Sequence, residues 1–231
     1  KATPAQLQYL SSTRPPEELY NCVEDPLNLN NLAYSLNHEK LVTQMRNTLH
    51  RHLVQSRDLG LVPEIELWRH ARAMPPMEWA KTGDFDAERL LAAAELVGTD
   101  DFGAISEALE DRHPSIRYWG AVACSAADVL PAEAREQLQA MFDDASPAVA
   151  IETASAVARH AGDPKAIDSL VQWFDNDDRT TVLHAVRAIE MLASPRANAA
   201  VRRLADRYQD EPGDLAWFIR FSTSGYLNRQ K

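Results

Sequence analysis

The second part of the chain repeats itself with a step of thirty-three residues. The string Asp111-Arg112-His113-Pro114-Ser115-Ile116 is followed one step later by Asp144-Ala145-Ser146-Pro147-Ala148-Val149. Two further steps bring Asp177-Asp178-Arg179-Thr180-Thr181-Val182 and Asp210-Glu211-Pro212-Gly213-Asp214-Leu215. Self-similarity at a fixed period of this length indicates small supersecondary units that stack into a solenoid.

Apolar residues follow the same step, independently of the turn. The turn and two columns of apolar residues share one period. Such agreement is hard to obtain by chance, so the register of the repeat is well determined. The two apolar columns are Ile105, Leu138, Val171 and Leu204, and Leu90, Ala123, Ala156 and Ile189.

Each unit reads as a pair of antiparallel helices. The pattern Asp-x-x-Pro places a capping side chain, such as Asp111, Asp144 or Asp177, beside a φ-restricted residue where a helix should begin. An alanine-rich amphipathic stretch, a short break and a second amphipathic stretch follow. We expect helix pairs at about 85–111, 114–143, 146–176 and 179–209, then a closing helix near 213–226. Trp217, Phe218 and Phe221 should cap the final pair.

The repeat resembles the short HEAT-like repeats. A step of thirty-three is also typical of ankyrin, and tetratricopeptide repeats are one residue longer. However, the Thr-Pro-Leu-His motif of ankyrin and the Trp-Leu-Gly-Tyr pattern of tetratricopeptides are both missing. The resemblance covers about residues 84–227 and predicts a mainly α protein whose repeat region is an α-solenoid.

Composition limits the classes of protein that remain. Eight glycines in 231 residues are few, which favours helices over a β-rich fold. The net charge of −10 disfavours nucleic acid as a partner. No apolar run reaches the ~20 residues of a membrane span. Two lone cysteines, Cys22 and Cys124, exclude a disulfide framework. The chain begins at Lys1 without a methionine or a signal peptide, from which we expect processing or truncation.

Charge is distributed unevenly and suggests a boundary. Residues 1–80 carry 8 Lys/Arg and 9 Asp/Glu, whereas residues 81–231 carry 16 and 25. We expect three parts: a strand–turn–helix segment at 1–57, a connecting helical segment at 58–83 and the repeat domain at 84–231. Apolar residues in the connecting segment, among them Ile65 and Trp79, indicate that it packs and is not a free linker.

The first part reads as a strand, a turn and a helix. Leu19 to Val23 form a short apolar strand, Glu24-Asp25-Pro26 make a turn, and an asparagine-rich loop follows. Residues 37–56 form a helix with an apolar face at a spacing of four. Because a lone strand is not stable, this piece should join a sheet. The apolar face of the helix consists of Leu41, Met45, Leu49 and Leu53.

Residues 14–57 resemble the C-terminal end of type I sulfatases, in particular heparan N-sulfatase-like enzymes. The matching residues are Glu17-Glu18-Leu19-Tyr20, Asp25-Pro26 and Asn30-Asn31-Leu32-Ala33. Asn21 and Cys22 depart from the usual Asp-Leu, and Asn28 departs from the usual Glu. The resemblance implies a helix that packs on a small C-terminal sheet, a structural role for the motif, and a periplasmic or secreted location.

The resemblance transfers no catalytic residue to this chain. The family's nucleophile arises from Cys or Ser in Cys/Ser-x-Pro-x-Arg, and neither Cys22 nor Cys124 stands in that motif. The calcium ligands of the family belong to a catalytic domain that precedes this region. We therefore predict no catalytic, cofactor-binding or metal-binding residue here, with calcium confined to that other domain.

Other candidate sites have plainer explanations. His50 and His52 lie two apart on a helix, so their rings point to different faces. His38-Glu39 begins like a zincin motif, but Val42 occupies the position of the second histidine. The acidic group Asp175, Asp177 and Asp178 is read as a helix cap with solvated charge. The basic face Arg202, Arg203 and Arg207 is read as a solvated helix surface. The tryptophans should be packing anchors: Trp68, Trp79, Trp119 and Trp173.

Two functions of different classes remain open at this point. The chain is either the non-catalytic C-terminal portion of a sulfatase-like hydrolase or a free-standing HEAT-like binding module. The expected partners are the catalytic domain, another protein or a second copy of the chain, and neither nucleic acid nor a membrane.

Overall fold

The computed structural model describes residues 2–11 and 14–230, and every regular element among them is helical. The chain forms two compact units, residues 1–57 and residues 58–231. Each unit is described by itself. No helix in the described ranges is long and apolar enough to cross a membrane.

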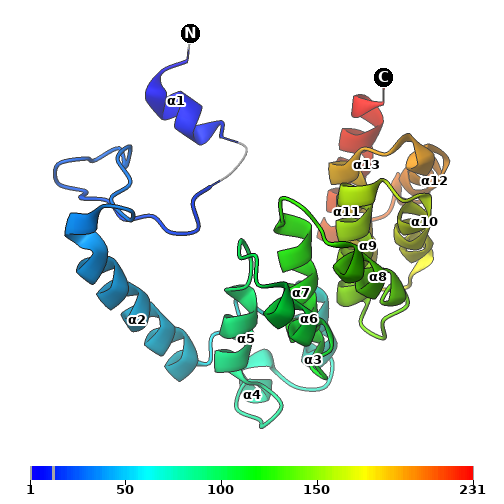
Figure 1. Cartoon of the computed structure of the whole chain (residues 1–231). Coiled ribbons are helices and arrows are strands. Elements are labelled where there is room, and N and C mark those ends of the chain that lie inside the picture. Colours follow the sequence, from blue (N-terminus) through cyan, green and yellow to red (C-terminus); the bar gives the residue numbers. More distant parts are fainter. Residues whose placement is uncertain (1, 12–13, 231) are drawn as a thin grey trace. The chain divides into compact units, whose positions relative to one another are not determined.

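Unit 1 contains α1 (Pro4–Tyr9), the short 3₁₀ helix η1 (Leu36–His38) and α2 (Glu39–Ser56), coloured blue in Figure 1. The strand expected from Leu19 to Val23 is absent, and this prediction was wrong. The segment is irregular there, because the chain offers it no neighbouring strand. One backbone hydrogen bond, from Leu32 N to Leu19 O at 2.7 Å, is all that resembles strand pairing between these segments.

The apolar side chains of unit 1 remain at its surface. Among its described residues, none has a buried side chain. On α2, the expected apolar face is largely exposed at Leu41, Met45 and Leu49. Burial of apolar surface is the main force that stabilises a fold. Unit 1 therefore has almost no hydrophobic core of its own.

Unit 2 contains the connecting segment and the repeats. Every predicted helix pair is present, and the closing helix begins at Asp214. The prediction of a mainly α, HEAT-like solenoid is confirmed for this part. Its helices are α3 (Glu64–Ala71), α4 (Pro76–Trp79), α5 (Ala87–Ala94), α6 (Phe102–Leu109), α7 (Pro114–Ala126), α8 (Ala132–Ala140), α9 (Pro147–Ala161), α10 (Pro164–Gln172), α11 (Arg179–Leu192), α12 (Asn198–Tyr208) and α13 (Asp214–Arg229), with 3₁₀ turns η2 (Trp173–Asp175) and η3 (Pro195–Ala197).

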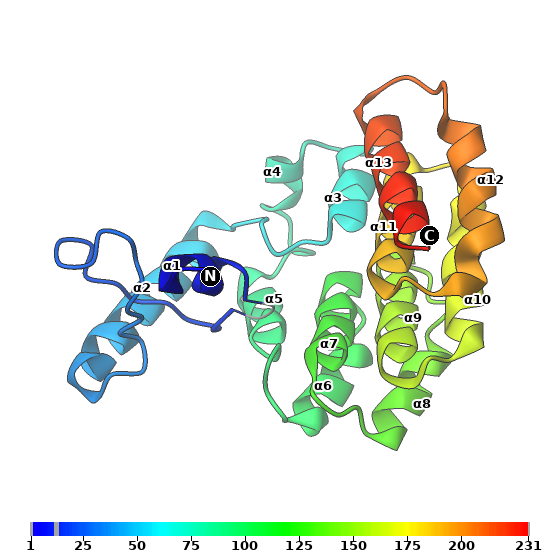
Figure 2. The same cartoon turned by 90° about the horizontal axis from the view of Figure 1, so that it is seen from above.

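The repeats stack in two layers (Figure 2). We call α5, α7, α9, α11 and α13 the inner layer, and α6, α8, α10 and α12 the outer layer. A continuous core fills the space between them, with Leu138, Val157 and Ile189 fully buried. Close packing depends on small residues: a Cβ added at Gly120 on α7 would lie 3.1 Å from the Leu109 backbone nitrogen at the end of α6.

The inner helices begin by a mechanism that differs from the predicted one. Asp111 and Asp144 are not the capping residues, because His113 and Ser146 occupy those positions. Each aspartate lies two residues earlier and accepts a hydrogen bond from the capping residue's backbone nitrogen, at 2.7 and 2.8 Å. The aspartates therefore shape the turn that places the cap.

The third repeat is displaced by one residue in this turn. Asn176, not Asp177, accepts the backbone hydrogen bond at 2.9 Å, and Asp178 caps α11. Asp177 is exposed, so its predicted role as a cap was wrong. The last inner helix, α13, follows Gly213 and has no side-chain cap.

The connecting segment packs on the repeats as part of unit 2. Ile65 on α3 is fully buried in the main core, and α3 lies against α9 and α11. The Trp119 indole of α7 donates a hydrogen bond to Leu61 O at 2.7 Å. Glu66 is also buried, and its Oε1 accepts a hydrogen bond of 2.6 Å from the Ser146 hydroxyl. These contacts hold α3 at one side of the inner layer.

Candidate functional site

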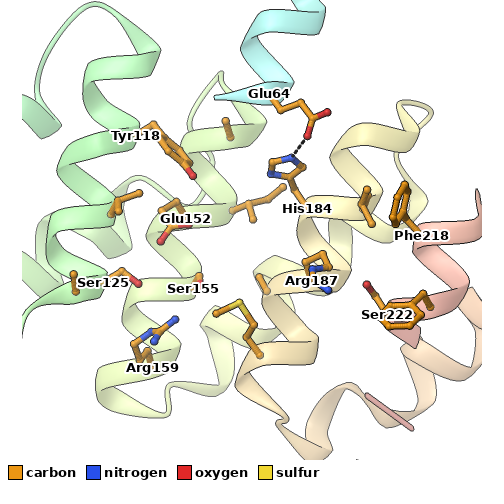
Figure 3. A pocket seen from close by; sticks show the side chains of 18 of the residues that line it. Glu64, Tyr118, Ser125, Glu152, Ser155, Arg159, His184, Arg187, Phe218 and Ser222 are labelled. Atoms are coloured by element: carbon orange, nitrogen blue, oxygen red, sulfur yellow. Dashed lines mark hydrogen bonds and ion pairs between the residues drawn. The ribbon is translucent and has the colours of Figure 1, made fainter. Parts of the chain in front are cut away.

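A groove of about 820 Å³ runs across the inner layer of unit 2. Its walls come from α7, α9, α11 and α13, and Glu64 at the start of α3 closes one side (Figure 3). Pockets of this volume fall within the range that proteins use for ligands. Because aromatic and aliphatic side chains also line it, we take this groove as the candidate functional site.

Helical spacing explains how the groove is lined. Residues three or four apart share one helix face, so each inner helix contributes one row of side chains. On α9 this row is Ile151, Ser155 and Arg159, with Glu152 beside it. The opposite face of α9 is packed into the core, where Val149 and Val157 are fully buried. One amphipathic pattern thus builds both the core and the groove.

An aromatic cluster forms one end of the groove. Trp217 and Phe221 on α13 stack with ring centroids 5.7 Å apart, and Phe218 meets Trp217 edge-on at 5.0 Å. We call these three residues the aromatic cluster. Their exposed fractions are 52%, 48% and 57% for Trp217, Phe218 and Phe221. The prediction that they cap the final helix pair was wrong, because Ile219 and Tyr226 fill that role on the buried face of α13.

Polar groups gather at the α7–α9 side of the groove. The pKa of the Glu152 carboxyl is raised by burial, which outweighs the opposing effects of the Ser125 hydroxyl and the Arg159 charge. Burial, and secondarily the Glu152 charge, raises the pKa of Tyr118 to about 12. This side of the groove therefore places the buried Glu152 carboxyl within reach of the Arg159 charge.

The remaining charged groups of the groove are paired within the protein. The His184 ring nitrogen Nε2 lies 3.5 Å from Glu64 Oε2. The Arg187 guanidinium donates to Glu190 Oε2 at 3.2 Å. By contrast, Arg159 has no ion pair or hydrogen bond with any residue that the structure describes, and its charge acts on Glu152, where it counteracts the rise in pKa.

The histidines and acidic residues singled out from sequence do not assemble into a site. His50 and His52 lie on α2 in unit 1. In the described ranges, no group of three His, Cys, Asp or Glu side chains is placed to hold a metal ion. Asp175 pairs with Arg207, and Asp178 caps α11 through the Thr180 backbone nitrogen at 3.2 Å.

The other candidates lie at separate positions on their helices. His38 ends η1 and Glu39 begins α2. Arg202 and Arg203 are exposed on α12, whereas Arg207 also donates to Phe174 O at 2.7 Å.

The two cysteines differ in surroundings, and both are free thiols. Cys22 is exposed in unit 1. Cys124 is buried in α7, and burial raises its pKa to about 11. A thiol with so high a pKa is a poor nucleophile, because the thiolate is the reactive form.

The four tryptophans predicted to be packing anchors differ in their burial and contacts. Trp79 is buried and stacks on His70, with ring centroids 3.9 Å apart, and Trp119 ties α7 to the connecting segment. Trp173 is partly buried in η2. Trp68 is half exposed, and its indole donates to Glu64 Oε1 at 3.2 Å, so the anchor prediction fails there.

Sequence reasoning missed the groove itself. The sequence did contain a signal for the groove. The inner helices carry apolar or aromatic residues on a second face, in addition to those on the face that forms the core. Met191, for example, lies on α11 two residues after the buried Ile189 and is exposed. Recognising the groove requires knowledge of which faces of successive helices align.

Comparisons with known proteins agree with this architecture. Residues 134–217 match the family model described as HEAT repeats. Over 79 residues, or 32% of this chain, the sequence is 32% identical to the "Ulvan-active sulfatase" of Formosa agariphila, and the aligned stretch covers 13% of that protein. No solved structure gives a significant match. The chain is thus similar to HEAT-repeat proteins over its second part, which indicates a structural or interaction role.

Proposed function

We propose that this chain is the non-catalytic C-terminal portion of a sulfatase-like sulfuric ester hydrolase. Unit 1 would pack against the catalytic domain of that enzyme, and the helical repeats would serve a structural or interaction role. The observation that carries the proposal is that unit 1 lacks any buried side chain among its described residues, although it contains the sulfatase-like motif. A segment of this kind needs a surface on which to fold.

The residues of the sulfatase-like motif form hydrogen bonds that stabilise the loop within unit 1. Asn31 Oδ1 accepts hydrogen bonds from the backbone nitrogens of Leu19 at 2.9 Å and Ala33 at 3.0 Å, and its Nδ2 donates to Glu17 O at 3.0 Å. Asp25 Oδ2 accepts from the Asn30 backbone nitrogen at 2.8 Å. These bonds fix the shape of the loop, which is what the resemblance implies for the motif.

A second contact joins the motif to α2. The Arg46 guanidinium donates two hydrogen bonds of 2.5 Å to the Glu17 carboxylate, and this contact holds the pKa of Glu17 below its usual value. With the loop attached to α2 in this way, Leu41, Met45 and Leu49 remain exposed on the helix. In the proposed enzyme, this apolar face would lie against the catalytic domain.

The chain itself supplies no reaction chemistry under this proposal. Cys22 and Cys124 lie outside the formylglycine motif, and Cys124 is buried besides. Calcium, which sulfatase catalysis would require, is assigned to the catalytic domain and to no residue of this chain. The 32% identity to a sulfatase over 79 residues supports the family link.

The coding sequence upstream of Lys1 tests the proposal directly. We expect a Cys/Ser-x-Pro-x-Arg motif and a set of acidic metal ligands in the same reading frame. A reading frame that begins at this chain, or an unrelated upstream domain, would contradict the proposal and favour a free-standing HEAT-like module. In the full enzyme, Leu49→Asp should lower soluble yield and aryl-sulfatase activity, whereas the matched surface change Arg203→Asp on α12 should change neither.

A further inference from the structure

We propose that His70, Trp79 and His113 form an acid-sensitive attachment of α4 to the repeats, which opens when the two histidines are protonated. We call these three residues the histidine–tryptophan stack. In acid, α4 and the first turn of α7 open while the main core of unit 2 stays folded. The inference goes beyond the proposed function and does not rest on it, because it concerns contacts within unit 2 alone.

The three rings of the histidine–tryptophan stack lie nearly parallel. The ring centroid of Trp79 is 3.9 Å from that of His70 on α3, with 14° between the planes. It is 6.4 Å from that of His113 at the start of α7, with 22° between the planes. The Trp79 indole nitrogen is buried and has no hydrogen bond with any residue that the structure describes. Ring stacking and apolar contacts therefore hold Trp79 in place.

The apolar contacts of α4 belong to a small cluster that is separate from the main core. Trp79 is the buried residue of α4, and Trp119 of α7 packs against the same cluster. By contrast, α3 reaches the main core through Ile65. A local opening at α4 therefore exposes the small cluster without disrupting the main core. The buried members of the small cluster are Val62, Trp79, Ala80, Phe85 and Leu90.

His113 also caps α7, and the cap requires a neutral ring. Its Nδ1 accepts a hydrogen bond from the Ser115 backbone nitrogen at 3.3 Å. A protonated imidazole donates at both nitrogens, so protonation removes this acceptor and places a positive charge at the positive end of the helix dipole. The caps of α9 and α11 are Ser146 and Asp178, neither of which becomes cationic in acid. Acid therefore weakens the start of α7 in particular.

The surroundings of the two histidines favour their neutral forms. Burial is the largest influence on both rings and lowers the pKa of each, and a charge on His70 lowers the pKa of His113 further. Neighbouring carboxylates raise both pKa values and neighbouring guanidinium groups lower them, but the carboxylates do not outweigh burial. The carboxylates are Glu66, Asp84 and Asp111, and the guanidinium groups around the two rings are Arg69, Arg89 and Arg112.

The direction of the pH effect follows from these pKa values. In the open form both rings return to water, where the pKa of histidine is about 6.5. Protons therefore bind the open form more strongly than the closed form, and the open population rises as the pH falls below about 6.5. Between about pH 7.5 and about pH 5.5, each histidine can raise the opening constant by at most about tenfold.

A third histidine keeps α3 in place during this opening. His184 on α11 has its Nε2 3.5 Å from Glu64 Oε2 at the start of α3, so its protonation strengthens that contact. The buried Glu66 carboxylate, which accepts from the Ser146 hydroxyl, also holds α3 on the repeats. The opening is therefore confined to α4 and the first turn of α7.

Amide hydrogen exchange of the full chain, followed residue by residue by NMR, tests the proposal. Ala80, Thr82 and Arg117 donate backbone hydrogen bonds in α4, just after it and in the first turn of α7. Protection factors correct for the slower chemical exchange in acid and report the opening constant. Between about pH 7.5 and about pH 5.5, the protection of these three amides should fall by about threefold or more, and by at most about a hundredfold.

Urea separates local opening from global unfolding. At about pH 5.5, low urea concentrations should hardly accelerate exchange of Ala80 and Arg117, because a local opening exposes little surface. Exchange of Val157 on α9 should accelerate with urea, because its opening exposes the main core. Urea slopes for Ala80 and Arg117 that equal the slope for Val157 would overturn the proposal.

Variants show whether the two histidines cause the opening. In the double variant His70→Gln, His113→Asn, the asparagine retains an acceptor for the cap of α7, and the fall in protection with pH should shrink to less than about twofold. His113→Asn alone should reduce the fall. The matched control is His52→Gln on the exposed surface of α2, which should leave the fall unchanged. A fall as large in both histidine variants as in the original chain would overturn the assignment.

Discussion

Arg117, near the start of α7, is joined to Asp144, in the turn before α9, by two parallel hydrogen bonds. Nε donates to Oδ2 at 2.9 Å and Nη2 donates to Oδ1 at 2.8 Å. Asp144 Oδ1 also accepts from the Ser146 backbone nitrogen, and Arg117 Nη1 donates to Asp111 O. One pair of side chains therefore links the turns of two consecutive repeats.

Breaking this pair should destabilise unit 2. Exposed fractions of 16% and 11% for the side chains of Arg117 and Asp144 place the pair largely out of water. Arg117→Ala leaves the Asp144 carboxylate without its partner, at an expected loss of about 2–3 kcal/mol in the free energy of unfolding. Urea denaturation measures this loss. The exposed pair Arg196–Asp168 is the control, since Arg196→Ala should cost less than about 1 kcal/mol.

The repeat register makes a second prediction. Ile116 and Val149 occupy equivalent buried positions on α7 and α9. Replacement of either by aspartate would place an unpaired charge in the core, so we expect a loss of about 3–5 kcal/mol. Val129→Asp, on an exposed valine between α7 and α8, should leave the melting temperature nearly unchanged. Melting curves that do not distinguish the core variants from Val129→Asp would refute the register.

Substitutions at the C-terminal ends of two helices should change the stability in opposite directions. Gly162 after α9 and Ala193 after α11 both adopt left-handed backbone conformations, with φ of 60° and 50°. A Cβ is disfavoured in this conformation, and one added at Gly162 would meet no atom within 4 Å. Ala193→Gly should therefore raise stability by about 0.5–1 kcal/mol, and Gly162→Ala should lower it by about 1 kcal/mol. Thermal unfolding that shows the same sign for both would contradict this reading.

Stability should depend on pH through two histidines that flank Trp79. Burial lowers the pKa of His70 and of His113, and each also lies near charged groups that include Glu66. The unfolded chain then binds more protons than the folded chain between these lowered values and about 6.5. The histidine contribution is complete above about 6.5 and is lost as the pH falls through the folded-state pKa values.

Urea titrations at a series of pH values from about 7.5 to 5 measure this dependence. Acidic side chains contribute to the same range, so the comparison is with the double variant His70→Gln, His113→Asn. The asparagine can still cap α7 in place of His113 Nδ1, which accepts from the Ser115 backbone nitrogen. We expect a shallower pH dependence in the variant. Identical slopes for the two proteins would contradict the assignment.

The thirty-three-residue periodicity predicted most of the fold of unit 2. Leu90, Ala123 and Ile189, which belong to one column, are all buried, because apolar residues recur wherever equivalent helices meet. The local details were less predictable. Asn176 replaces the expected Asp177 because either side chain can accept the same backbone hydrogen bond, so a shift of one residue costs little.

Features that depend on tertiary contacts could not be predicted from the sequence. The segment from Leu19 to Val23 has the composition of a strand but lacks a partner strand in this chain, and strand propensity without pairing does not form a sheet. Trp217, Phe218 and Phe221 were expected to cap the final helix pair. Because α13 packs against α11 and α12 with Ile219 and Tyr226 in the core, these three aromatic side chains remain about half exposed.

Amide hydrogen exchange of the full chain tests most directly the claim that unit 2 holds its own core while unit 1 depends on another domain. Exchange rates report the free energy of local opening. The prediction is strong protection in α9 and α11, where at least half of the residues are buried, and rapid exchange throughout α2. Protection of the α2 amides equal to that of α9, in the chain alone, would contradict the claim.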